Sequence, residues 1–363
     1  MTLKSAFART PTILIAALVA FPICAWSQKA PQYTLTDLGS LGRNSFGSGV
    51  NSAGRVTGYA DINMSSTEHA FLYSDGMMAD LGALGGVQSR GLAINNAGQV
   101  TGMADVNLAY AHAFLYSKGT MRDLGTLGGP SSVGRAVNNA GEVTGESFIT
   151  RNSDGVSYLH AFLYSQGKMR DLGTLDGGAY SIGHGINSAG EVTGEAATST
   201  GATHAMLYSK GKMRDLGTLG GDTSTGVAIN SAGEVAGTSA TTAEFGERAF
   251  LYSKGKMRDL GALAGDDSSL SLSINSRGQV VGVSYSTAPQ SPCCVQNPFL
   301  YTDGTMINLN THIDPSDPLA PYVVLSEANG ISDNGLIVAT GVDSRTHFGH
   351  AYLLTPVKGR DCR

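Results

Sequence analysis

Three residue types that form the nucleophilic triad of many hydrolases recur along this chain. In the second copy of an internal repeat they are Ser89, His112 and Asp123. A catalytic triad acts in one pocket that also holds an oxyanion site. Here the set returns in unit after unit, which catalysis rarely needs. The repetition therefore favours a structural hydrogen-bond network within each unit, because buried polar groups require partners.

Two positions break the repeat with side chains that could act on a ligand. Three residues before a recurrent Asn, other copies carry Ser, Leu or Val, but two adjacent copies carry Arg135 and His184. With His312 they are candidates for a binding or catalytic site at the mouth of a central channel. The alternative is that Arg135 and His184 are partly solvated channel residues. Convergence of both with an acid in one open pocket would distinguish these interpretations.

Basic residues gather in four consecutive turns between the third and fourth predicted strands. These turns hold ten of the 24 Lys and Arg residues: Lys118, Arg122, Lys168, Arg170, Lys210, Lys212, Arg214, Lys254, Lys256 and Arg258. Asp75 and Asp303 occupy the same turn in two other units, so the predicted cluster is an arc. Such an arc could attract an anionic polymer. Alternatively, lysine simply suits an exposed turn, and each arginine forms a weak surface pair with the adjacent aspartate.

The elements that carry these residues follow from the repeat. Each unit reads as four short strands, exemplified by SRGLAIN, QVTGMA, HAFLYS and MRDLGTL. The turns NNAG and SKG supply residues that tolerate a positive φ. The Leu of the DLG triplet returns at a spacing suited to one four-stranded propeller blade: Leu38, Leu81, Leu124, Leu172, Leu216, Leu260 and Leu309. Small residues such as Gly91 and Ala93 place the first strand innermost, beside the channel.

The order of the strands predicts how the ring closes. The first three strands occur in seven copies, but the seventh copy of the fourth strand lies at the other end, at 33–38. We therefore predict an all-β, seven-bladed β-propeller over residues 33–355, closed by its N-terminal strand, with a tail at 356–363. Insertions at Phe148–Leu159, Tyr285–Asn297 and Asn310–Leu325 are expected on one face. These insertions are candidates for binding a partner. Alternatively, their lengths reflect neutral drift.

Residues 1–27 are predicted to be a secretory signal peptide. Lys4 and Arg9 precede an apolar run, and Ala25-Trp26-Ser27 resembles a cleavage site. No later segment could cross a membrane, so we expect a secreted protein, extracellular or periplasmic. Removal of Lys4 and Arg9 would change the formal net charge from −5 to −7. Acidity and export together argue against a nucleic-acid partner.

Cysteine usage points to a disulfide. Cys293, Cys294 and Cys362 remain after the signal peptide, which allows one disulfide with a free thiol, or a vicinal pair. We predict that Cys362 pairs with Cys293 or Cys294. The chain lacks CxxC and a second ligand cluster, so no metal is expected. The LGG segments carry no phosphate-loop motif, and no cofactor is expected.

The motifs HAFLYS, MRDLGTLGG and INNAGQV resemble the HAF-type extracellular repeat family of bacteria. Five units carry its His-Ala pair, at His69, His112, His160, His204 and His350. The tail segments LNTHIDPSD and ISDNGLIVATG also resemble the last unit of that family. The resemblance covers essentially the whole mature chain and implies export and a propeller-like repeat. That family has no established function.

These observations favour an exported, non-catalytic propeller that binds a surface partner. Its partner would be an anionic polysaccharide or another envelope protein. The alternative is an exported propeller hydrolase or lyase with its site at the channel mouth. A purely structural envelope component is a third interpretation.

Overall fold

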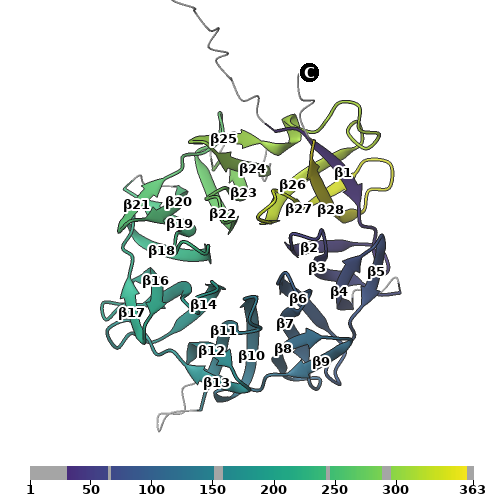
Figure 1. Cartoon of the computed structure of the whole chain (residues 1–363). Helices are drawn as coiled ribbons and strands as arrows, with labels where there is room; N and C mark the ends of the chain where they lie inside the picture. Colours follow the sequence, from purple (N-terminus) through teal and green to yellow (C-terminus); the bar gives the residue numbers. More distant parts are fainter. Residues whose placement is uncertain (1–30, 64–66, 151–157, 243–245, 288–295, 358–363) are drawn as a thin grey trace, which may run out of the picture. The chain divides into compact units, whose positions relative to one another are not determined.

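Seven antiparallel sheets of four strands are arranged in a ring around a central axis (Figure 1). This computed structural model describes residues 31–357, except for 64–66, 151–157, 243–245 and 288–295. In each sheet the strand that comes first in the repeat lies innermost. The seven-bladed β-propeller predicted from the repeat is confirmed.

The first three blades follow directly along the chain. Blade one comprises β2 (Ser45–Val50), β3 (Val56–Asp61), β4 (Glu68–Ser74) and β5 (Met77–Asp80). Blade two comprises β6 (Ser89–Ile94), β7 (Val100–Asp105), β8 (Ala111–Ser117) and β9 (Thr120–Asp123). Blade three comprises β10 (Gly128–Val137), β11 (Val143–Ile149), β12 (Leu159–Ser165) and β13 (Lys168–Asp171).

The remaining blades repeat this order until the last. Blade four comprises β14 (Ser181–Ile186), β15 (Val192–Ala197), β16 (Thr203–Ser209) and β17 (Lys212–Asp215). Blade five comprises β18 (Gly220–Ile229), β19 (Val235–Thr241), β20 (Glu247–Ser253) and β21 (Lys256–Asp259). Blade six comprises β22 (Ser268–Ile274), β23 (Val280–Tyr285), β24 (Gln296–Thr302) and β25 (Thr305–Asn308). Blade seven takes β26 (Val323–Ile331), β27 (Ile337–Asp343), β28 (Gly349–Pro356) and β1 (Tyr33–Asp37).

The N-terminal strand closes the ring as the strand order predicts. β1 pairs antiparallel with β28, from Tyr33 opposite Pro356 to Asp37 opposite Tyr352. Tyr33 and Leu35 are buried by this pairing. Because β28 continues to Pro356, the last blade extends one residue beyond the predicted boundary at 355.

The hairpins between the third and fourth strands of each blade, here called the outer hairpins, explain the recurrent Lys-Gly and Asp-Gly pairs. Lys118 has a φ of 51° and Gly119 a φ of 82°. Positive φ at both central residues characterises the two-residue type I′ turn, whose twist matches that of the flanking strands. Asp75, Gln166, Lys210, Lys254 and Asp303 adopt the same conformation in other blades.

The apolar core lies between blades rather than within them. One cluster joins Ala113 and Leu124 of blade two to Val137, Val143 and Phe162 of blade three. Small residues on the inner strands allow this close approach: a Cβ on Gly134 would lie 2.3 Å from Oγ1 of Thr101. Each blade therefore depends on its neighbour for burial.

The two ends of the blades form different surfaces. The turns between the first and second strands lie beside the outer hairpins, since Glu142 in one accepts a hydrogen bond of 2.8 Å from Ser165 in the other. We call this end the hairpin face and the opposite end the loop face. The connection from blade six to blade seven, with the short 3-10 helix η1 (Leu309–Thr311), lies on the loop face. Among the described residues, no helix is long and apolar enough to span a membrane.

Candidate functional site

A β-bulge on each inner strand determines which side chains enter the channel. The register of inner and second strands shifts at the same repeat position in all seven blades. A bulge leaves one residue unpaired and re-aims its side chain. The bulged residues all line one cavity of about 270 Å³, here called the inner channel cavity: Ser48, Leu92, Arg135, His184, Val227, Leu272 and Asn329.

Arg135 and His184 thus share a cavity, and each has a glutamate beside it. Arg135 Nη2 donates to Glu146 Oε1 at 2.7 Å, and its Nε donates to Oε2 of the same carboxylate. His184 Nε2 lies 3.9 Å from Glu195 Oε2, which accepts a hydrogen bond of 2.6 Å from Thr225 Oγ1. Burial opposes ionisation of Glu195, but His184 and Thr225 outweigh it and hold its pKa below the usual value. Arg135 is therefore paired with Glu146, and the ionised Glu195 lies beside His184.

The sequence reasoning missed both glutamates. They follow the Val-Thr-Gly of the second strand, where blades one and two carry Tyr59 and Met103 instead. The change from Tyr or Met to Glu at this position is visible in the sequence. That each glutamate lies beside Arg135 or His184 depends on the β-bulge, which sequence spacing does not reveal.

The third channel candidate lies elsewhere. His312 Nδ1 is 2.9 Å from the carbonyl oxygen of Asn308, and the His312 carbonyl accepts a hydrogen bond from Tyr33 N. Tyr33 belongs to β1, the outermost strand of blade seven. His312 therefore lies at the outer edge of the ring, and its predicted place at the channel mouth is wrong.

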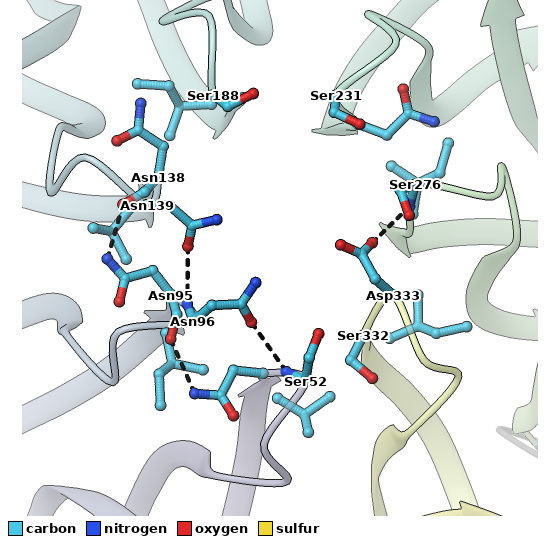
Figure 2. Close-up of a pocket in the computed structure, with 18 of the residues that line it drawn as sticks. Ser52, Asn95, Asn96, Asn138, Asn139, Ser188, Ser231, Ser276, Ser332 and Asp333 are labelled. Carbon is cyan, nitrogen blue, oxygen red and sulfur yellow. Dashed lines mark hydrogen bonds between the residues drawn. The ribbon is translucent and has the colours of Figure 1, made fainter.

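At the hairpin face, buried asparagines link the blades around the channel mouth (Figure 2). Asn51 Nδ2 donates to the carbonyl of Asn95 at 3.0 Å, and Asn95 Nδ2 to that of Asn138 at 2.8 Å. The same bond continues from Asn138, Asn187, Asn230 and Asn275 to the next blade. Blade seven has Ser332 in this position, and Asn334 Nδ2 completes the ring by donating to Ser52 O.

The residues that follow these six asparagines and Ser332 surround a polar cavity of about 260 Å³, here called the mouth cavity. They are Ser52, Asn96, Asn139, Ser188, Ser231, Ser276 and Asp333. A ring of apolar residues lines the mouth cavity, and all of them except Val137 also line the inner channel cavity: Val50, Ile94, Val137, Ile186, Ile229, Ile274 and Ile331. This apolar ring separates the polar mouth from Arg135 and His184.

The recurrent Ser, His and Asp form bonds, but not the trio expected within one blade. His112 Nδ1 lies 2.9 Å from Asp123 Oδ2, and Asp123 Oδ1 accepts a hydrogen bond from Gly125 N. The serine that completes this arrangement is Ser132 of the next blade. It donates to the Gly125 carbonyl at 2.6 Å and accepts from Ala113 N at 2.9 Å.

Ser89 does the same for blade one, where it bonds Ala70 N and the Gly82 carbonyl. The Ser89–His112–Asp123 set is therefore divided between two junctions, and its serine has no contact with the imidazole. We call the repeated arrangement the interblade clasp. The bonds support a structural role for these side chains, and that role lies between blades rather than within one.

The basic arc divides into two kinds of residue. All six lysines are exposed on the hairpin face. The arginines instead lie over tyrosine rings of the following blade, as Arg122 does over Tyr164 at 5.8 Å and Arg170 over Tyr208 at 5.5 Å. Arg214 and Arg258 repeat this contact. The expected Arg–Asp surface pairs are replaced by cation–π contacts, because those aspartates lie against histidine or a backbone amide.

Several predicted features fall outside the described residues. They are the signal peptide at 1–27, the cysteines Cys293, Cys294 and Cys362, and the tips of two insertions. Among the residues that the structure describes, no group of three or more His, Cys, Asp or Glu side chains could hold a metal ion.

Neither a protein-family model nor a curated protein sequence matches this chain. Solved structures are similar to this chain at low identity and with TM-scores below 0.5. TolB from Acinetobacter baumannii is 11% identical with a TM-score of 0.44, covering 84% of this chain and 64% of its own. A gluconolactonase from Xanthomonas campestris is 9% identical with a TM-score of 0.40, covering 91% and 96%. A puromycin-hydrolyzing peptidase from Mycobacterium tuberculosis is 13% identical with a TM-score of 0.49, covering 82% and 49%. The chain thus spans less than two thirds of the TolB chain and about half of the peptidase.

Proposed function

We propose that this protein is an exported, non-catalytic binding module whose hairpin face engages an anionic surface polymer. The observation that carries the proposal is the arc of exposed lysines on that face, at Lys118, Lys168, Lys210, Lys212, Lys254 and Lys256. Charges of one sign on one surface add into a field that attracts a polyanion. The predicted signal peptide and the proposed membership of the HAF-type repeat family support export, to the periplasm or the medium.

Acidic residues on the same face limit where such a polymer could lie. Glu142, Glu191 and Glu234 accept hydrogen bonds from serines of the outer hairpins. Hydrogen bonds from Ser209 and Asn187 hold the pKa of Glu191 below its usual value, so that carboxylate is ionised at neutral pH. These acids lie between the lysines and the mouth cavity. We infer that the polymer runs along the rim and stays out of the channel.

The test is binding to an acidic polysaccharide such as alginate, with neutral dextran as comparison. Binding at low salt should weaken as salt rises, because exposed charges are screened. Charge reversal of Lys210, Lys212, Lys254 and Lys256 to Glu should abolish it.

A matched pair of variants extends the arc. Asp75→Lys and Asp303→Lys place lysine in turns whose backbone already matches that of Lys118 and Lys254. They should strengthen binding. Absence of alginate binding at low ionic strength would overturn the proposal. Binding that survives the charge reversal would show that the lysine arc is not the binding site.

The alternative, an exported hydrolase or lyase, would use Arg135 and His184. Their shared cavity favours it, and the two-point ion pair of Arg135 with Glu146 opposes it. Within the described residues, His184 Nε2 has no hydrogen-bond partner, whereas an activated nucleophile would lie within hydrogen-bond distance of its base. Turnover of a glycan or ester by the wild-type protein, lost in His184→Ala, would establish this activity.

A further inference from the structure

A groove between blades seven and one carries an aromatic pair on the loop face. Its volume is about 220 Å³. It is lined by Asn44, Ser45, Phe46, Tyr59, Ala60, Asp61 and Glu68 of blade one, and by Thr340 and Gly349 of blade seven. A Cβ on Gly349 would have its nearest neighbour at 3.9 Å, so the blade-seven wall is open there.

Three planar groups stack along one wall of the groove. The rings of Phe46 and Tyr59 face each other across the β2–β3 pair, with centroids 5.0 Å apart and an interplanar angle of 18°. The guanidinium of Arg90 lies 4.8 Å from the centroid of the Tyr59 ring. Glu68 holds Arg90 in place through a hydrogen bond of 2.6 Å. Tyr59 is thus in contact with both Phe46 and Arg90, and Phe46 forms one end of the stack.

The aromatic pair breaks the repeat. The residues that pair at the same positions in other blades are Arg90 with Met103, Val133 with Glu146, Ile182 with Glu195, Thr225 with Thr238, Leu270 with Val283 and Glu327 with Thr340. None of these pairs is aromatic. Structural requirements shared by all blades therefore do not explain Phe46 and Tyr59.

The polar groups beside the stack are acceptors and amides. Asn44 Nδ2 donates to Asp61 Oδ2 at 2.8 Å, and Asn44 Oδ1 accepts from Gly349 N at 3.1 Å. Two carboxylates, Asp61 and Glu68, face a single cation, Arg90. This excess of negative charge disfavours an anionic ligand. A cationic ligand is disfavoured because Arg90 already covers the available face of Tyr59.

We propose that this groove binds one ring of a neutral sugar presented by a glycan. The face of an aromatic ring is negative and attracts the C–H groups on the flat side of a pyranose. The carboxylate of Asp61 and the amide of Asn44 suit hydroxyl groups at the edge of that ring. This site goes beyond the proposed function, because it lies on the loop face rather than the hairpin face and binds a neutral ligand rather than a polyanion.

The experiment is a titration of the full chain with neutral oligosaccharides of glucose, galactose, mannose, xylose and N-acetylglucosamine. At least one should bind saturably, with an affinity that does not change with salt. Phe46→Ala and Phe46→Leu should each weaken binding by about tenfold or more, and Phe46→Trp should strengthen it.

Ile182→Ala is the matched control, because Ile182 occupies the position of Phe46 in blade four. It should bind as the wild type does. Phe46→Leu keeps an apolar side chain, so a thermal melt of that variant separates loss of binding from loss of folding. The proposal is overturned if no neutral sugar binds, if Phe46→Leu binds unchanged, or if the groove instead prefers a quaternary ammonium compound.

Discussion

The junctions from blade two to blade six differ in kind from the junction between blades six and seven. The former repeat a serine clasp and an arginine over a tyrosine, in addition to the asparagine bond that all these junctions share. At the latter, Asn310 bonds the backbone of Leu325 in place of the clasp, and Ile307 stands where the arginine would be. An apolar cluster of thirteen buried residues, including Tyr33, Leu309 and Tyr352, joins these two blades.

The difference follows from how the ring closes. Continuous blades are held in register by their own hairpins, so polar contacts of modest strength suffice to orient them. Blade seven is assembled from both ends of the propeller, and its fourth strand must be recruited from a distant part of the chain. Apolar burial supplies the larger, non-directional stabilisation that this closure requires.

The largest effect should come from removing the recruited strand. A chain that begins at Gly39 loses the burial of Tyr33 and Leu35, each worth roughly 2 kcal/mol, and exposes the edge of β28. Urea unfolding should show a loss of about 4 kcal/mol or more. Thr34→Ala with Thr36→Ala, which alters only exposed side chains, is the control. Equal stability of the truncated and full chains would contradict closure by this strand.

The next effect tests the clasp. Ser132→Ala leaves the buried amide of Ala113 and the carbonyl of Gly125 without their partner, at a cost of about 1–3 kcal/mol. Ser326 holds the equivalent repeat position at the irregular junction, but it donates to Thr340 within its own blade. Ser326→Ala should therefore cost less than about 1 kcal/mol. Equal losses in chemical denaturation would show that the two junctions do not differ.

A pH effect should appear at the clasp that ties β28 to β1. The hydrogen bond to Asp37 raises the pKa of His350 above 6.5. The stabilisation of the folded state by protonated His350 is therefore complete below pH 6.5 and is lost as the pH rises through the raised pKa. Burial opposes ionisation of Asp37, but hydrogen bonds from His350 and Gly39 keep its pKa below 3.8. The stabilisation of the folded state by ionised Asp37 is present above pH 3.8 and is lost as the pH falls through the lowered pKa.

The stabilising effect of this pair should therefore be greatest between these limits. The difference in melting temperature between wild type and His350→Gln, measured across pH, should be largest in that window and shrink on both sides. Arg248→Gln is the control, since arginine occupies the histidine position in blade five. A difference that is constant with pH would exclude an ionised His350–Asp37 pair.

The smallest effect concerns the arginine stacks. Arg170→Ala removes the contact with Tyr208 and a hydrogen bond of 2.8 Å to its hydroxyl, which should cost about 0.5–1 kcal/mol. Ala79 occupies the arginine position of blade one, opposite Tyr116 of blade two. Ala79→Arg should therefore stabilise the protein by a similar amount. Thermal melts of both variants measure this, and opposite shifts are expected.

The sequence by itself determined the number of blades, the order of their strands and the closure by residues 33–38. These properties are carried by local signals: apolar runs, Gly-containing turns and a period that is visible along one chain. The exposed lysine arc was also predictable, because turn residues are exposed wherever the turn is placed.

Only the tertiary structure decided which residues meet. The bulge turns Arg135 and His184 into the channel, and the packing of blade three on blade two brings Ser132 rather than Ser89 to the clasp of His112. The same packing places His312 at the outer edge and places Phe46 in a groove that blade seven also lines. Contacts of this kind depend on register and on residues of the neighbouring blade, as with Ser132 and Ala113, separated by 19 positions, or Asn51 and Asn95, separated by 44. The sequence period shows which residues occupy equivalent positions in different blades. The packing of one blade on the next decides which of those residues form a site.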